Sequence, residues 1–159
     1  MLNYDFWTKW LIAIGLFLVL FGLALALFNQ SLIFETLFHS NVDPVFWGAG
    51  AVPRSALDFR RWVYAVLGAT VAGWGAFLTF LAHYAFRRRE LWAWNCVLVG
   101  MLVWYLPDTI LSMRSGVVFN AVFNTILLIL VMSPLAFTRR HFSGQAARHR
   151  SRHPRKGAS

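Results

Sequence analysis

The sequence is short of cysteine and of charge, and each shortage excludes a class of protein. Its single cysteine, Cys96, allows no intramolecular disulfide, no thiol redox pair and no cysteine-based zinc site. Only 13% of the residues are charged, whereas soluble domains carry about 25%. Acidic residues are the scarcest, since 6 Asp and Glu stand against 15 Lys and Arg, for a net charge of +9. An ordinary soluble domain is therefore excluded.

Long apolar runs take the place of the missing charge. Hydrophobic residues make up 58% of the chain and aromatic residues 17%, and the mean hydropathy is +0.56. Four runs approach the ~20 residues that a helix needs to cross a bilayer, and they lie at about residues 8–28, 62–86, 91–112 and 117–137. The sequence predicts an all-α membrane protein, with a four-transmembrane-helix bundle over residues 1–138. Residues 139–159 are basic and nearly free of large apolar side chains, which predicts a disordered tail.

Basic residues are unevenly shared between the two sides of such a bundle. Eleven Lys and Arg lie in the N-terminal segment, the turn at 87–89 and the tail, and four lie on the opposite side. The positive-inside rule then places both termini in the cytoplasm, as in a multi-pass protein of the bacterial inner membrane. Residues 24–26 have the small-x-small form of a signal-peptide cleavage site, but the apolar run continues through Phe28, which favours an uncleaved span.

The expected partners follow from this distribution of charge. The bilayer itself is the main one, and the basic tail is expected to contact anionic lipid. The tail lacks the interleaved aromatic residues and the fold of a nucleic-acid interface, so nucleic acid is not an expected partner.

Small residues recur at every fourth position of the second run. They form two adjacent stripes, which are Ala65, Ala69 and Gly73, and Gly68, Ala72 and Ala76. Small residues let helix backbones approach closely in lipid, where apolar burial does not drive association. The pattern predicts that both stripes are packing surfaces and that this helix is the central one.

The segment between the first two runs, residues 29–61, is long and apolar for a loop. We expect a short interfacial helix at about residues 31–39, and turns at Asp43-Pro44 and at the glycines that follow. Ser55 and Asp58 have the spacing of a capping box, which predicts that the second helix begins before the membrane. This segment is either a lid over the outer end of the bundle or an anchor that faces lipid.

A carboxylate within the third apolar run raises the question of a functional site. Asp108 follows Pro107 in the stretch WYLPDTILSMRSG, residues 104–116. Helical spacing and a tight turn place polar residues of the third and fourth runs at a similar depth, where the start of the second run adds two arginines and a tyrosine. The candidate outer polar cluster consists of Asp108, Thr109, Ser112, Asn120, Asn124, Arg60, Arg61 and Tyr64.

Two interpretations of this cluster stay open. Ionisable groups at membrane depth commonly mark ligand or ion pathways, so the cluster is a candidate ligand site. Asp108 also lies close to the membrane interface, where a purely structural clasp between helices, at ~1 kcal/mol per contact, explains it as well. In either case burial disfavours a charge on Asp108 unless Arg60, Arg61 or Arg114 pairs with it.

A resemblance covers roughly residues 60–138. The stretches RWVYAVLGATVAGWG, FRRRELWAW and WYLPDTILSMRSGVVFNAVFNTILLILVMSPLAF occur there in order. With them the chain resembles a family of short bacterial four-span integral membrane proteins whose activity is uncharacterised. The resemblance implies a four-span fold and no activity. The positions that match the family pattern are Gly68, Gly73, Trp74, Asp108, Thr109, Ser112, Gly116, Asn120 and Asn124.

Sequence motifs for catalysis or for cofactor binding are missing. The chain has no nucleophile–base pair, no metal-ligand set and no phosphate-binding loop, so we expect no cofactor and no metal. This favours a non-enzymatic membrane interaction or accessory protein, which binds a protein partner or forms a homo-oligomer. The alternative is small-molecule or lipid binding or transport through an outer-leaflet polar pocket around Asp108.

Overall fold

The computed structural model describes residues 4–48, 50 and 52–152, with side chains described as far as Phe142. The helices are α1 (Tyr4–Phe28), α2 (Leu32–Phe34), the π-helical η1 (Glu35–His39), α3 (Ser40–Trp47), α4 (Arg54–Leu81), the π-helical η2 (Ala82–Phe86), α5 (Leu91–Arg114) and α6 (Val118–Arg152). No strand occurs among the described residues. Four helical stretches are long and apolar enough to cross a membrane, and they are Tyr4–Phe28, Arg54–Phe86, Leu91–Arg114 and Val118–Phe142. The prediction of an all-α chain with four such helices is confirmed.

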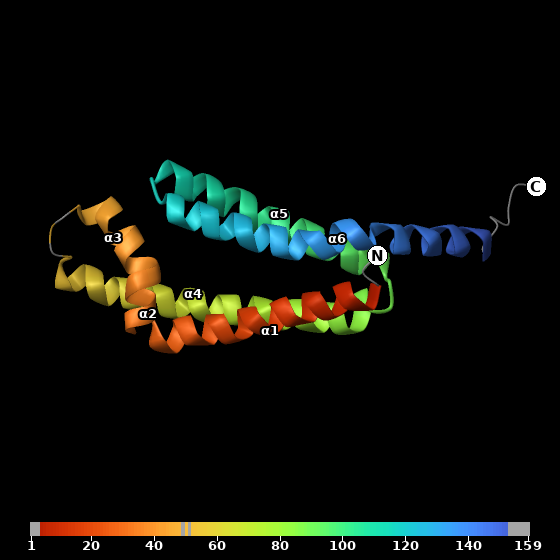
Figure 1. Cartoon of the computed structure of the whole chain (residues 1–159), viewed down its shortest axis with the longest axis horizontal. Coiled ribbons are helices and arrows are strands. Elements are labelled where there is room, and N and C mark those ends of the chain that lie inside the picture. The colour runs from red at the N-terminus through yellow and green to blue at the C-terminus, as the bar shows by residue number, and fades with distance from the viewer. Residues whose placement is uncertain (1–3, 49, 51, 153–159) are drawn as a thin grey trace, which may run out of the picture.

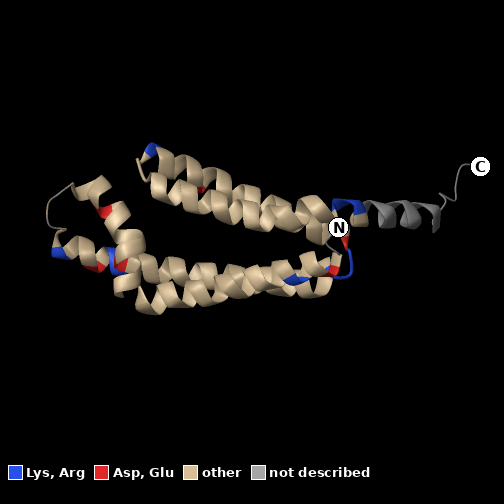
Figure 2. Ribbon diagram, in the orientation of Figure 1, with Lys and Arg blue, Asp and Glu red and all other residues tan. Residues whose placement is uncertain are grey.

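The four long helices form two pairs. α1 packs along α4, and α5 packs along α6 (Figure 1). The pairs meet near the N-terminus of α1, where α1 contacts α6 and η2, and they diverge toward the other end, where α2, η1 and α3 lie between them (Figure 1). Lys, Arg, Asp and Glu gather at the two ends of the helices and leave the middle almost free of charge (Figure 2), as spans through hydrocarbon require.

Glycines bring α1 and α4 into close contact. A Cβ built on Gly22 would lie 2.4 Å from the backbone nitrogen of Ala72, and one on Gly75 would lie 2.7 Å from the carbonyl oxygen of Gly15. Only glycine permits this separation, because the opposing atoms are backbone and cannot rotate away. The contact on α4 runs through Gly68, Ala72 and Gly75, all of which are buried.

The predicted stripe of Ala65, Ala69 and Gly73 does not take part in this contact. Ala69 and Gly73 are exposed, Ala65 is half-buried, and a Cβ on Gly73 would meet nothing within 4 Å. These residues are rotated around the helix from the Gly68 side. The prediction that the second run is the central helix stays a prediction, because α1 contacts α4 and α6 while the second run contacts α1 and, through η2, α5.

Aromatic rings close the end at which the two helix pairs meet. Tyr4, Phe86 and Phe142 are 7%, 0% and 1% exposed. The Tyr4 ring stacks on Phe86 at 5.8 Å between centroids, and Phe86 meets Phe142 at 5.0 Å. The Tyr4 hydroxyl donates a hydrogen bond to the Phe86 carbonyl. This cluster joins α1, η2 and α6, so it fixes one end of both pairs.

Several element boundaries differ from those expected. α4 begins at Arg54 with Pro53 in the N-cap position and without a side-chain cap, so Ser55 and Asp58 lie inside the helix and form no capping box. Asp43 and Pro44 lie within α3 and make no turn, and the chain turns instead at Gly48, whose φ is +60°.

The segment after α1 and the C-terminal tail are both helical over longer stretches than expected. In place of a single helix at 31–39, the chain is helical from Leu32 to Trp47 through α2, η1 and α3. Within the tail expected to be disordered, α6 is helical as far as Arg152, and residues 153–159 lie outside the described part of the chain.

Candidate functional site

A cavity of about 410 Å³ lies between the two helix pairs, at the end away from the Tyr4 cluster. This volume is within the range of ~300–1,000 Å³ typical of small-molecule pockets. α1, α4 and α6 supply most of the lining, whereas α5 supplies only Trp104 and Ser112. The walls are mainly apolar and include Leu18, Phe21, Leu25, Val63, Leu67, Val71 and Leu127.

The segment from α2 to α3, here called the wedge (residues 32–47), occupies the open end of the cavity. Phe38 of the wedge contacts the rings of Phe119 and Phe123 on α6, at 5.3 and 5.7 Å between centroids. Phe34 contacts Phe21 of α1 at 6.1 Å. The wedge therefore touches both helix pairs and forms the cavity wall at that end, with Phe38, Val42, Asp43, Phe46 and Trp47. This position corresponds to the lid in the sequence hypothesis.

Indole rings form the opposite end of the cavity. Trp74 of α4 and Trp104 of α5 both line it, and their ring centroids are 5.8 Å apart. This ring pair joins α4 to α5. The cavity thus runs from mid-helix to the wedge, and α5 supplies only two of its lining residues.

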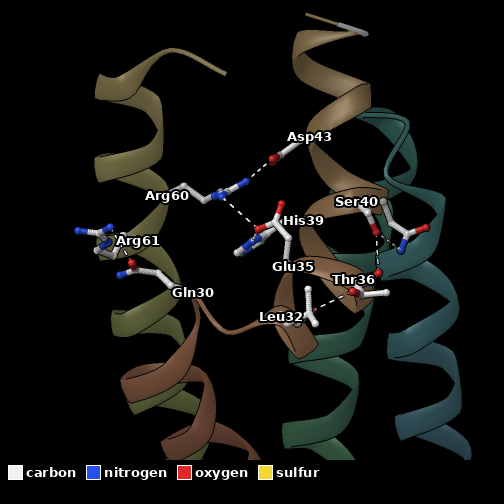
Figure 3. A network of polar contacts seen from close by, with 10 residues as sticks. Gln30, Leu32, Glu35, Thr36, His39, Ser40, Asp43, Arg60 and Arg61 are labelled. Carbon is white, nitrogen blue, oxygen red and sulfur yellow. Dashed lines mark hydrogen bonds and ion pairs between the residues drawn. The ribbon is translucent and has the colours of Figure 1, made fainter. Parts of the chain in front are cut away.

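An ion-pair network ties the wedge to α4 (Figure 3). Arg60 forms an ion pair with Asp43, and both side chains are only 16% exposed. A second Arg60 nitrogen lies 3.6 Å from Glu35 Oε2, and His39 Nδ1 lies 2.8 Å from the same oxygen. Because Arg60 is on α4, whereas Asp43, Glu35 and His39 are on the wedge, this network holds the wedge in place.

Glu35, His39 and Asp43 were not among the site residues predicted from the sequence. Their signal is a spacing of four residues, which puts all three on one face of a continuous helix. The prediction of turns after residue 39 hid that face, because Asp43-Pro44 was interpreted as a break. Pro44 instead lies inside α3, and the chain is helical on both sides of it although proline has no backbone N–H to donate.

Asp108 lies in a second polar cluster, between α5 and α6. Asn120 Nδ2 donates to Asp108 Oδ1 at 2.8 Å and to Ser112 Oγ at 2.7 Å. Ser112 Oγ donates to the Asp108 carbonyl at 2.7 Å and lies 3.2 Å from Asp108 Oδ1. A Gly116-centred turn makes this possible, since Gly116 has φ +77° and the Val117 N–H bonds the Ser112 carbonyl at 2.9 Å. The geometry is that of a clasp between the two helices.

The structure divides the predicted cluster into separate groups. Arg60, Tyr64, Ser112, Asn120 and Asn124 line the cavity. Asp108 does not line it and contacts two residues that do. Thr109 lies outside the lining, and its buried Oγ1 has no hydrogen-bond partner. Among the described residues Asp108 forms no ion pair.

The remaining arginines have other neighbours. Arg61 donates to Gln30 Oε1 at 2.6 Å, and Arg114 is exposed at the end of α5. Of the arginines considered as partners for Asp108, Arg60 binds Asp43 and Glu35, and Arg61 binds Gln30.

Asn124 lies in the cavity wall and carries a buried side-chain donor without a hydrogen-bond partner. It is 2% exposed, and its Nδ2 makes no hydrogen bond. Such a buried donor costs about 1–3 kcal/mol when it stays unpaired.

Comparison of the chain with protein-family models, with curated proteins and with solved structures gave no match.

Proposed function

We propose that this chain is a non-enzymatic multi-pass protein of the bacterial inner membrane that binds an amphipathic small molecule or a lipid in the cavity between its helix pairs. The observation that carries the proposal is Asn124, a buried amide donor without a partner on the wall of an otherwise apolar cavity. An acceptor on a ligand would remove the cost of that unpaired donor. The proposal takes up the ligand-binding alternative of the sequence analysis and moves its centre from Asp108 to Asn124.

The shape of the cavity supports a ligand that is mostly apolar. The aliphatic and aromatic walls favour a hydrocarbon body, and burial of such a body contributes about 25 cal/mol per Å². The polar groups stand nearer the wedge, where Arg60, Asp43, Ser112 and Asn120 line the cavity. A ligand with an apolar body and a polar end matches this division.

The small share of α5 in the lining supports access from the bilayer on that side. α5 supplies two lining residues, and α4 and α5 meet at the Trp74–Trp104 pair. A ligand already dissolved in the membrane would then enter sideways without crossing water. The wedge would keep water out of the outer end, with the Arg60–Asp43 ion pair as its fastening.

Native mass spectrometry of the full chain released from its own membrane tests the proposal. Val71→Phe fills the cavity, because Val71 lines it, and should abolish retention of the bound molecule. Val66→Phe is the matched control, since Val66 lies on the same helix, is 48% exposed and does not line the cavity. The control should retain the molecule as the wild type does.

Asn124→Leu separates polar recognition from simple filling. The substitution keeps a similar size and removes the donor, and its ligand occupancy should fall about tenfold if one hydrogen bond is lost. A bound molecule that survives both Val71→Phe and Asn124→Leu would overturn the proposal, provided that each variant purifies as a folded protein.

The interaction or accessory function stays a second candidate because of one observation. Ala69 and Gly73 are exposed on α4, with open space beside Gly73. Small residues on an exposed membrane helix permit close approach of a second copy or of a partner helix. A defined oligomer in the same mass spectra that Gly73→Leu dissociates would support this candidate.

A further inference from the structure

A second and smaller cavity lies at the junction of α1, η1 and α4, where Arg60 separates it from the larger one. Its volume is about 180 Å³. In contrast to the first cavity it is lined almost wholly by polar side chains, which are Asn29, Gln30, Glu35, His39, Arg60 and Arg61. Figure 3 shows Arg60 of α4 pointing toward Glu35 and His39 of the wedge, and Arg61 beside Gln30 on the other side of α4. We call it the headgroup pocket.

His39 is the unusual member of the headgroup pocket. It is 2% exposed, and its Nδ1 lies 2.8 Å from Glu35 Oε2. An ionised carboxylate only accepts hydrogen bonds, so Nδ1 carries a proton and donates it. The other ring nitrogen, Nε2, is buried and has no hydrogen-bond partner. A ligand bound in the pocket could supply the hydrogen bond that this buried nitrogen lacks.

Arg61 and Gln30 bring hydrogen-bond donors with spare capacity to the pocket. Arg61 uses one guanidinium N–H for Gln30 Oε1 at 2.6 Å, and its side chain is otherwise exposed. Gln30 accepts that bond through its oxygen, which leaves its amide N–H groups for an acceptor. The carboxylate in the lining, Glu35, already faces His39 and Arg60, so the donors of Arg61 and Gln30 favour an anionic ligand.

The charge of the pocket shows how an anion is accommodated. The titratable groups that face His39 are Glu35 on η1, Asp43 on α3, and Arg60, Arg61 and Tyr64 on α4, with the Tyr64 ring 5.1 Å from the imidazole. Two guanidinium groups are balanced by two carboxylates, so an incoming anion has no excess positive charge to neutralise it. Protonation of His39 supplies that charge and also turns Nε2 into a donor.

We propose that the headgroup pocket binds the oxyanion of a phosphate ester, and that His39 takes up a proton when it binds. The imidazolium would lie between Glu35 and the anion, donating one N–H to each. Arg61 would supply a charge-assisted hydrogen bond from the outer side. The site is independent of the ligand in the larger cavity, since neither His39 nor Arg61 lines that cavity.

The test uses the full chain in a phosphorus-free maltoside detergent, with dimethyl phosphate as the probe. This diester keeps a single negative charge between pH 5.5 and 8, so a change of affinity with pH reports on the protein. Phosphorus-31 line broadening gives the affinity at each pH. Uptake of one proton makes the affinity of the wild type rise as pH falls, by up to about tenfold per pH unit.

Three variants decide the outcome. His39→Gln should remove the pH dependence, and Arg61→Gln should weaken binding about tenfold while the pH dependence stays. Arg54→Gln is the control, because Arg54 is exposed on the same helix and lies outside the pocket, and it should change the affinity by less than about twofold. A pH dependence that survives His39→Gln would overturn the proposal. Equal losses in Arg61→Gln and Arg54→Gln would also overturn it, because they would mean diffuse attraction only.

Nanodiscs that contain phosphatidylglycerol distinguish the two sources of such an anion. If native mass spectrometry finds an anionic lipid that the wild type retains and Arg61→Gln loses, the oxyanion belongs to a lipid headgroup. If no lipid is retained while dimethyl phosphate binds in detergent, it belongs to a soluble phosphate ester. Val71→Phe should leave both results unchanged, so failure of the larger cavity as a ligand site is seen separately.

Discussion

Adding one methyl group to α4 should have opposite effects on stability at two glycines five residues apart. Gly68 faces α1, and a Cβ built there would lie 2.4 Å from Ala26 N, 2.6 Å from Gly22 O and 2.9 Å from Ala26 Cα. Gly73 is on the same helix, and a Cβ there would meet nothing within 4 Å. Gly68→Ala and Gly73→Ala therefore form a matched pair, with the same added atom and the same helix.

The magnitude follows from the contacts. Normal separation of carbon from other heavy atoms is about 3.5 Å or more, so Gly68→Ala requires α1 and α4 to separate locally by about 1 Å. Overpacking of this kind costs about 1–3 kcal/mol, and the upper part of that range applies because backbone atoms cannot move aside. Replacement of glycine by alanine within a helix raises the free energy of unfolding by up to ~1 kcal/mol, which offsets part of this cost. The expected net loss for Gly68→Ala is about 2 kcal/mol.

Gly73→Ala has the higher helix propensity of alanine without the overpacking against α1. Its free energy of unfolding should rise by about 0.5–1 kcal/mol. The two variants should thus differ by about 3 kcal/mol, which is roughly a 100-fold difference in the folding equilibrium. The dodecyl sulfate titration of the purified protein in mixed micelles, followed by tryptophan fluorescence and circular dichroism, measures both. Changes of the same sign in the two variants would refute the reasoning about the α1–α4 contact.

Two further predictions concern the Asp108 clasp and the orientation in the membrane. Asp108→Asn keeps an oxygen that can accept from Asn120, so it should alter the free energy of unfolding by less than about 1 kcal/mol. Asn120→Leu leaves Asp108 Oδ1 with only the 3.2 Å contact to Ser112, so it should lower the free energy of unfolding by about 1–3 kcal/mol in the same titration. Equal losses in the free energy of unfolding for the two variants would mean that Asn120 does not stabilise the protein through its hydrogen bond to Asp108. Ser40→Cys in a Cys96→Ser background should react with an impermeant maleimide on intact spheroplasts, because the side of the wedge carries four of the fifteen Lys and Arg. Reaction only after lysis would reverse the orientation.

The candidate site was predictable where local spacing decides contact. Asp108, Ser112 and Asn120 were expected together from helical spacing and a tight turn, and their side chains are hydrogen-bonded. Arg60 was expected near them and instead pairs with Asp43. The difference arises because the pairing depends on where residues 32–47 lie, and no periodicity along the chain specifies that position.

The small residues of α4 show the same limit. Both stripes have the spacing that permits close packing, and the sequence offers no means of choosing between them. The choice is made by α1, whose Gly15, Gly22 and Ala26 face Gly68, Ala72 and Gly75. A complementary glycine pattern on a second helix is a long-range property and becomes visible only when the register of the two helices is known.

The sequence alone determined that this protein is helical and has four helices able to cross a membrane, because the length and hydropathy of a run are properties of that run by itself. Tertiary structure decided the rest. The meeting of Tyr4, Phe86 and Phe142 closes one end of the helix pairs, and the wedge fills the other. The cavity between them exists because aromatic side chains distant in sequence hold the pairs apart, and contacts between distant residues depend on the packing of whole helices.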